Sequence, residues 1–195
     1  MTRAVPSPSR LRRLLPHLRT AWPLLLLLPV LTLAGVGSAE PALKAALVYK
    51  LAQFIEWPEA ASGQFTICVL GDDPFDGTLD RLEGREIDHV PIETAHYAQS
   101  DQVPETCRIL YLSPEKRVFQ RQILEKFSRW PMLTLGETDE FAEQGGMIQF
   151  HRQDGRIGFI INPERARAAG LRIAAPLLSM SQIVETRSRD GEAQP

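Results

Sequence analysis

The sequence predicts an α/β fold: a single domain with a mostly parallel central sheet, helices on both faces and a C-terminal antiparallel hairpin. Short apolar runs at 65–70, 107–112 and 132–136 are bounded by turn residues and are typical of buried strands. Segments with helical periodicity alternate with these runs over short connections, which favours parallel strands. Asp154 and Gly155 separate two further apolar runs, which predicts a tight hairpin.

Residues 1–39 have the pattern of a secretory signal peptide. Five arginines and no acidic residue occur in residues 1–20, and an apolar stretch follows. This stretch contains prolines and falls short of the roughly 20 apolar residues that span a bilayer, so a cleaved signal is favoured over an uncleaved anchor. Small residues precede Glu40, which predicts cleavage after Ala39, and no cysteine lies there to carry a lipid. We therefore expect an exported protein.

The mature chain is acidic. Five of the 22 basic residues and none of the 24 acidic residues lie in residues 1–39, which leaves a net charge of −7 after cleavage. Such a charge repels nucleic acid and anionic lipid, so neither is an expected partner. Residues 40–186 suffice for one domain with a buried core, and residues 187–195 form a polar tail.

The first predicted helix lies in residues 41–58. Its apolar stripe consists of Leu43, Leu47, Leu51, Phe54 and Ile55. Pro58 disfavours helical backbone at Trp57, so the helix ends there and the chain turns into the first buried strand. We expect the stripe to pack the helix onto the sheet; the alternative is a dimer interface.

The middle of the chain predicts two helices around a mixed segment. Residues 74–84 resemble a short helix that ends at Gly84, and residues 85–97 predict one or two edge strands around Pro91. In residues 113–130, Ser113 caps a helix that begins at Pro114. Its apolar stripe is Phe119, Ile123 and Phe127, widened by Leu124.

After the third strand, residues 138–146 predict a short helix that ends at Gly145. The hairpin at 147–161 follows. Asn162 caps a further helix that begins at Pro163 and ends at Gly170. A last helix covers residues 175–185.

Two cysteines remain in the mature chain, Cys68 and Cys107, on two strands that we expect to be neighbours. An exported chain meets an oxidising compartment, where an even pair of cysteines usually forms a disulfide. We therefore predict a Cys68–Cys107 disulfide; two buried thiols are the alternative.

No motif in the sequence indicates a catalytic site. The loop with Asp72 and Asp73 lacks the glycine spacing of a phosphate-binding loop and is typical of a turn. A phospho-receiver domain would need an acidic acceptor where Ser113 stands. Three histidines lack metal-ligand spacing: His89, His96 and His151. An enzymatic function therefore has no chemical basis in these motifs, although a catalyst with an unrecognised site is an alternative, and we expect no cofactor or metal ion.

Six segments between about Ala42 and Val184 match one known family in order and spacing. They are KAALVYKLAQFIEWP, FTICVLGDDPF, CRILYLS, PMLTLGETDEFAEQGGMIQF, GRIGFIIN and ARAAGLRIAAPLLSMSQIV. In these segments the chain resembles the YfiR-type periplasmic proteins, which repress an inner-membrane diguanylate cyclase. Cys68 and Cys107 fall where the best-studied type has one of its two cysteine pairs. Its second pair is missing here, and Gln149 stands where asparagine is usual.

The resemblance implies a periplasmic α/β protein that controls cyclic di-GMP by protein contact, without catalysis. The implied partners are the periplasmic part of a membrane diguanylate cyclase, an outer-membrane lipoprotein that sequesters the repressor, and a second copy of the chain. A periplasmic small-ligand-binding protein is the alternative function, although the usual two-lobed kind needs a longer chain.

The C-terminal hairpin and the helix after it supply the candidate contact residues. Ile157, Phe159 and Ile161 share one face of a strand, so Ile160 points to the other, where a helix or a partner covers it. Charged residues around an apolar surface are typical of a protein interface. The expected contacts are Phe150, Ile160, Arg165 and Arg167, with burial of Phe150 in the core as the alternative.

Overall fold

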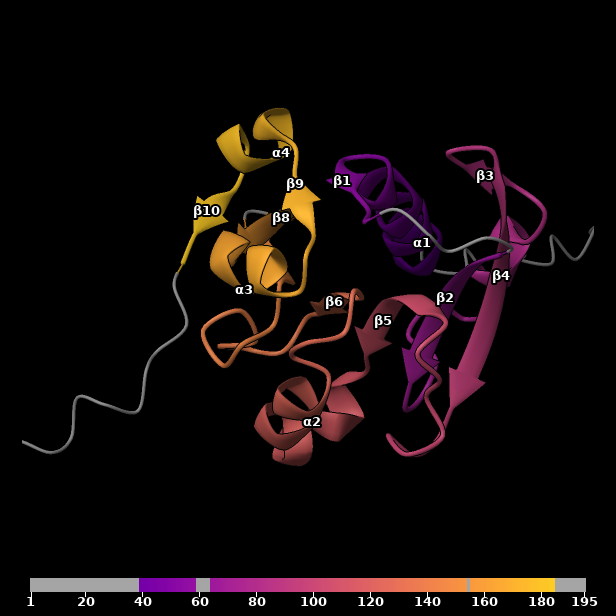
Figure 1. The fold of residues 1–195 in the computed structure, drawn as a ribbon, viewed down its shortest axis with the longest axis horizontal. Helices are drawn as coiled ribbons and strands as arrows, with labels where there is room; N and C mark the ends of the chain where they lie inside the picture. Colours follow the sequence, from indigo (N-terminus) through magenta and orange to yellow (C-terminus); the bar gives the residue numbers. More distant parts are fainter. Residues whose placement is uncertain (1–38, 59–63, 154, 185–195) are drawn as a thin grey trace, which may run out of the picture. The chain divides into compact units, whose positions relative to one another are not determined.

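The computed structural model describes residues 39–58, 64–153 and 155–184 (Figure 1). The main sheet contains β2 (Phe65–Leu70), β3 (Glu86–Ile87), β4 (Val90–Tyr97), β5 (Cys107–Leu112), β6 (Leu133–Gly136), β7 (Ile148–Gln153), β8 (Arg156–Ile161) and β10 (Gln182–Ile183). β1 (Ile55–Glu56) and β9 (Arg172–Ile173) form a separate antiparallel pair. The α-helices are α1 (Ala39–Ala52), α2 (Gln120–Lys126), α3 (Pro163–Ala168) and α4 (Ala175–Ser179). In the described ranges, no helix has the length and apolar character needed to cross a membrane.

The main sheet has the strand order β10-β8-β7-β6-β5-β2-β4-β3. The neighbouring strands β4, β2, β5, β6 and β7 pair in parallel, whereas β8 pairs antiparallel with β7. The chain order reverses between β2 and β5, because β4 lies on one side of β2 and the later strands on the other. The predicted parallel sheet and C-terminal hairpin are therefore confirmed.

Helices cover both faces of the sheet, as predicted (Figure 1). One core cluster joins α1, α3 and α4 to one face, for example through Val48, Ala166 and Leu177. A second cluster packs Ile123 and Phe127, from α2 and its end, on the other face. From Ile67 to Leu70 and from Ile109 to Leu112, successive residues of β2 and β5 alternate between these clusters, because side chains alternate along a strand.

The first helix has a different buried face from the predicted stripe. The residues that α1 buries are Lys44, Ala45, Val48, Leu51 and Ala52. Leu43 is 49% exposed, and Ile55 belongs to β1, where it pairs with Ile173. The helix ends at Ala52, earlier than expected, because this strand pairing takes over. Its buried face packs into the core, and Trp57 stacks edge-on against Phe65 with ring centroids 5.0 Å apart.

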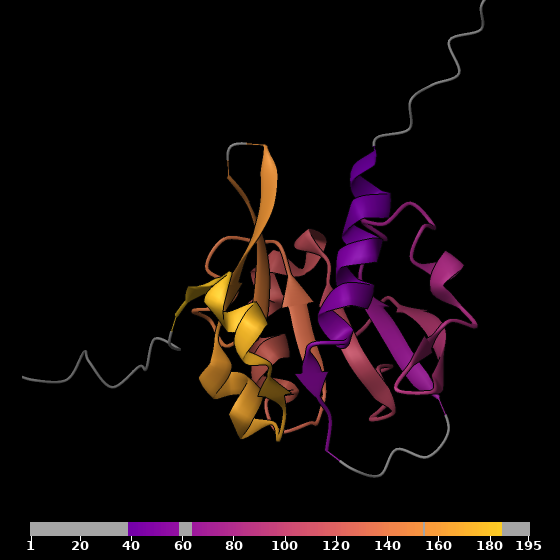
Figure 2. The same cartoon turned by 90° about the horizontal axis from the view of Figure 1, so that it is seen from above.

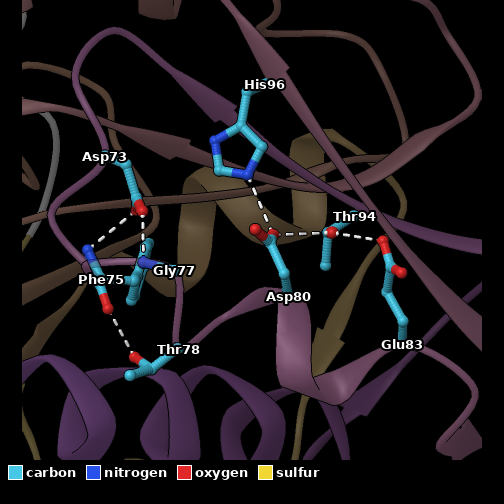
Figure 3. A network of polar contacts seen from close by, with 8 residues as sticks. All are labelled: Asp73, Phe75, Gly77, Thr78, Asp80, Glu83, Thr94 and His96. Atoms are coloured by element: carbon cyan, nitrogen blue, oxygen red, sulfur yellow. Dashed lines mark hydrogen bonds and ion pairs between the residues drawn. The ribbon is translucent and has the colours of Figure 1, made fainter.

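The helix predicted at 74–84 is wrong apart from one 3-10 turn, η1 (Asp80–Leu82). The Asp73 carboxylate accepts hydrogen bonds from the backbone N–H groups of Phe75 and Gly77, and the Thr78 hydroxyl donates to the Phe75 carbonyl (Figure 3). These bonds hold the chain in a turn, because a short acidic side chain competes with the helix for backbone donors.

The helix predicted at 138–146 is also wrong, since this segment consists of turns. The ring of Phe141 is fully buried and lies between Gly136 and Gly146. A Cβ atom at either glycine would overlap the ring. The turn thus places a buried aromatic ring beside the sheet.

Two other predicted helices are shorter than expected. Residues 113–130 form η2 (Pro114–Phe119) before α2, and Phe119 is 60% exposed instead of belonging to the buried stripe. Ser113 precedes the helix but makes no capping hydrogen bond through its side chain. At the C-terminal end, α4 stops at Ser179 and the chain continues as β10, which pairs with β8.

The hairpin and α3 follow their sequence signals. Gln153 pairs with Arg156 across the predicted two-residue turn, and Gly155 has a φ of 74°, which favours glycine. The Asn162 side chain accepts a hydrogen bond from the Arg165 backbone N–H, 3.1 Å away, and Pro163 begins α3. The predicted edge strands around Pro91 are present as β3 and β4.

Candidate functional site

Of the predicted contact residues, Phe150 and Ile160 lie on different faces of the hairpin, and Arg165 and Arg167 lie on α3. Phe150 is only 3% exposed and packs against Phe159 and Tyr111, with ring centroids 5.5 and 6.0 Å away. Its side chain thus belongs to the core, the alternative considered from the sequence. Ile160 is half-buried and lies opposite Gln149 on the other face of the hairpin. The structure does not bring Phe150 and Ile160 together.

The two arginines of α3 differ in exposure. Arg165 is half-buried, and its Nε donates to the Gly145 carbonyl at 3.3 Å, so it holds the turn before β7 against α3. Arg167 is exposed, and its Nε donates to the Pro163 carbonyl of its own helix at 3.3 Å. Of the two arginines, Arg167 therefore has the charge that is more available to a partner. The contact role of all four residues remains a prediction.

An ionic cluster connects the first turns of α1 to the hairpin and to the end of β6. Lys44 is buried to 9% exposure, and its Nζ lies 2.5 Å from Glu137 Oε2 and 3.4 Å from Glu40 Oε1. Glu40 also forms an ion pair with Arg152 of β7. The Arg152 hydrogen bond, with Lys44 nearby, lowers the pKa of Glu40 below its ordinary value. This cluster is not predicted from the sequence, where its one signal is a lysine inside an apolar helix.

Tyr111 lies close to this cluster and is fully buried. None of the described side-chain or backbone groups makes a hydrogen bond with its hydroxyl. Burial, together with the nearby negative charge of Glu137, raises the pKa of Tyr111. The hydroxyl therefore stays protonated and neutral, which suits a core residue better than a proton-transfer group.

A crevice of about 580 Å³ lies at the carboxyl ends of β2, β4 and β5, next to the point where the strand order reverses. Its lining includes Leu70, Phe119 and Ile123, with polar groups from Gln99, Glu115 and Lys126. Open α/β sheets commonly bind ligands at this place. The crevice thus combines an exposed aromatic ring with charged groups of both signs.

Ion pairs and hydrogen bonds organise the crevice walls. Glu115 accepts from the Asp72 backbone N–H at 2.9 Å and pairs with Lys116 at 2.8 Å; these contacts, chiefly that of Lys116, lower the pKa of Glu115. Lys126 Nζ donates to the Ser100 carbonyl at 2.7 Å. The predicted turn role of the acidic loop is seen at Asp73, whose carboxylate accepts from the backbone N–H groups of Phe75 and Gly77, whereas Asp72 contributes its backbone N–H to the crevice wall.

A polar network on β4 lies outside the crevice (Figure 3). The Asp80 carboxylate is 3.0 Å from His96 Nε2 and accepts from the Thr94 hydroxyl at 2.8 Å. The His96 contact lowers the pKa of Asp80. These contacts connect η1 to β4. Because the groups are largely exposed, we interpret the network as a structural one.

The structure joins Cys68 and Cys107 in a disulfide with Cα atoms 6.0 Å apart. The two cysteines lie on β2 and β5, which are neighbours as expected, and both are buried in the core cluster beneath α2. The bond therefore connects the two strands between which the strand order reverses.

Two solved structures share this fold at low sequence identity. The ABC domain in complex with L-Trp from Streptococcus pneumonia is 11% identical with a TM-score of 0.50, and the match covers 74% of this chain and 60% of that chain. A conserved domain protein from Vibrio cholerae O1 biovar El Tor strain N16961 is 9% identical with a TM-score of 0.51, covering 73% and 59%. The chain thus spans about three fifths of each, and these likenesses concern the fold alone.

No curated protein matches the chain. A family model described as YfiR/HmsC-like matches residues 41–182, from the first turn of α1 to β10. This range is well over half of the chain; it contains β2 to β8 of the main sheet, α2, α3 and α4, and most of α1. The chain therefore belongs to the YfiR/HmsC-like family.

Proposed function

We propose that this protein is a periplasmic regulator that represses an inner-membrane diguanylate cyclase by direct contact and so controls cyclic di-GMP. The observation that carries the proposal is the YfiR/HmsC-like match over residues 41–182. The protein acts by binding and not by catalysis. An outer-membrane lipoprotein that sequesters it, and a second copy of the chain, are proposed as further partners.

A repressor of this kind works through differential affinity. It has to bind the inactive conformation of the cyclase more tightly than the active one, because a ligand with equal affinity for both shifts nothing. Moving the cyclase from mostly active to mostly inactive takes about 5 kcal/mol of such preference. A surface that combines apolar side chains with arginines, as the hairpin and α3 do, is suited to supply it.

Deletion of the gene tests the proposal directly. We expect cellular cyclic di-GMP to rise, and a second deletion that removes the partner cyclase to cancel the rise. Unchanged cyclic di-GMP in the single mutant, with the cyclases expressed, would refute the regulatory role. Ile160→Asp is expected to raise cyclic di-GMP at normal protein levels, whereas Phe150→Asp should unfold the protein because the ring is buried.

The periplasmic location depends on the predicted signal at 1–39, of which residues 1–38 lie outside the described residues. N-terminal sequencing of the protein from a periplasmic extract is expected to give a start near Glu40. An intact Met1 on membrane-bound protein would contradict cleavage.

Small-ligand binding is a second candidate, favoured by the crevice of about 580 Å³ at the carboxyl ends of the strands. One solved structure of similar fold is a complex with L-Trp, which is a property of that protein. L-Trp added to the purified protein is the simplest probe. A rise in melting temperature that increases with L-Trp concentration, and that Phe119→Ala abolishes, would support this function.

A further inference from the structure

The outer half of β8 has an edge with no neighbouring strand. β10 pairs with β8 only beside Ile160 and Ile161. Among the described residues, no strand lies beside the β8 edge from Arg156 to Phe159. Figure 2 shows this part of the hairpin extending beyond its neighbours. Exposed strand edges are templates for pairing with another chain.

The hydrogen bonds at the base of the hairpin show which backbone groups point outward. The Ile161 carbonyl accepts from Val184 on the β10 side, whereas the next residue, Asn162, donates to the Met147 carbonyl on the β7 side. Backbone groups alternate in direction along a strand. The N–H groups of Ile157 and Phe159 therefore point to the open edge, and that of Gly158 points to β7.

A groove of about 540 Å³ runs along this edge. Ile157, Gly158 and Phe159 form one wall, and Ser179 to Gln182 form the other. Met180 on the far wall is 68% exposed, while Ile157 and Phe159 are half-buried against the main core cluster. An extended segment in the groove would meet backbone donors and an apolar continuation of the core.

The opposite edge of the hairpin is less available. β6 pairs with β7 only at Ile148 and Gln149, so the outer half of β7 also lacks a neighbouring strand among the described residues. There, however, Arg152 is paired with Glu40 of α1, and the space is smaller, about 320 Å³. The β8 edge is thus the better binding site.

The charge of the residues around the groove indicates which kind of segment would bind there. Residues 151–172 contain five arginines and two acids, a net charge of +3, whereas the rest of the mature chain carries −10. Arg156 is exposed at the groove, and His151 lies over Gly158 beside it. A second copy paired on this edge would bring two positively charged segments together, which like-charge repulsion opposes. An acidic segment from another protein would instead be attracted.

We propose that the outer edge of β8 binds an extended acidic segment of the partner protein as an added strand. This inference rests on the proposed function, since it describes how the repressor holds its partner. Side chains alternate along a strand, so the segment should present apolar residues to Ile157 and Phe159 and acidic residues to Arg156. Its backbone carbonyls accept the outward N–H groups.

Two substitutions test the added strand in the deletion strain. Arg156→Glu reverses the charge at the groove, and Ile157→Pro removes an outward N–H while keeping the bonds to β7. Both variants are expected to lose repression, with cyclic di-GMP close to the deletion level. The control is Arg172→Glu, which makes the same charge change at an 82% exposed side chain on β9 and should repress normally. Urea unfolding of each purified variant checks that the fold is kept.

Amide hydrogen exchange supplies the direct measurement. The probe is the purified periplasmic part of the cyclase whose deletion cancels the rise in cyclic di-GMP. On binding, the amides of Ile157 and Phe159 should exchange at least tenfold more slowly, whereas Gly158, bonded to β7 in both states, should change little. Equal protection of all three, or none, would overturn the proposal. Protection of the two amides at high concentration of this protein alone would also overturn it, in favour of a homodimer edge.

The outcomes separate the two proposals. If deletion leaves cyclic di-GMP unchanged, the regulatory function fails. If deletion raises cyclic di-GMP and the Arg156→Glu and Ile157→Pro proteins both repress like the wild type, only the strand addition fails. Loss of repression in Arg172→Glu as well would mean that general charge attraction, and not this groove, binds the partner.

Discussion

Reduction of the Cys68–Cys107 disulfide should destabilise the protein strongly. The bond closes a loop of 39 residues, and the chain-entropy model assigns such a loop about 4 kcal/mol of stability. Both sulfurs lie in the core, with the cysteines 0% and 1% exposed, so the reduced thiols still fill their space. Reduction therefore removes the cross-link and little packing.

Urea unfolding followed by tryptophan fluorescence, with and without a reductant, measures this effect. For a domain of this size the free energy falls by about 2 kcal/mol per molar urea, so the midpoint should drop by about 2 M. The double variant Cys68→Ala/Cys107→Ala should lose slightly more, because it also leaves small cavities. A midpoint shift below a quarter of the expected value in the reduced protein would refute the loop-entropy argument, provided that peptide mapping shows the linked pair beforehand.

Three further changes test other parts of the fold. Lys44→Met should cost about 3 kcal/mol, because it leaves Glu137 without its buried partner; adding Glu137→Gln should recover part of the loss in urea unfolding, and no recovery would contradict the pairing. Gly146→Ala should cost about 1–3 kcal/mol by the same assay, because its Cβ meets the Phe141 ring, and an unchanged midpoint would exclude that steric argument. Asp80 has a lowered pKa in the folded protein. Its contribution to folding stability is therefore present above its unfolded pKa of 3.8 and is lost as the pH falls through the lower folded pKa. Asp80→Asn should therefore cost less than about 1 kcal/mol at neutral pH and nothing in strong acid, and a cost that persists in acid would point to lost packing instead.

The sequence predicts well those elements whose signals are local. The buried strands need only an apolar run between turn residues, and the hairpin needs only Asp154 and Gly155 between two such runs. Asn162 and Pro163 likewise mark the start of α3 with their own chemistry. These segments fold as expected because their neighbours along the chain decide their conformation.

The elements that were mispredicted depend on partners far along the chain. Ile55 has helical spacing from Leu51, yet it pairs with Ile173 of β9. Ile183 stands in an apolar pattern that suits a helix, but it extends the sheet beside β8. Tertiary pairing overrides local periodicity in both cases, and no pattern within either segment announces it.

Only part of the candidate site could be predicted from the sequence, for the same reason. Alternation along β8 correctly separates Ile160 from Phe159, but it cannot show that β10 stops short and leaves an open edge. Lys44 appears in the sequence as a polar residue off the apolar stripe, whereas Glu137 brings it into the interior. A surface or an ion pair assembled from distant elements requires the coordinates.

The position of the Phe141 ring between two glycines limits which amino-acid substitutions this part of the chain tolerates. Gly136 lies five residues before Phe141, and Gly146 lies five residues after it. Because neither glycine has a Cβ atom, the ring of Phe141 fits between them. The three positions therefore vary as one unit: an alanine at either glycine becomes acceptable only with a smaller side chain at 141. A laboratory library that randomises 136, 141 and 146 together should return solutions of constant total volume.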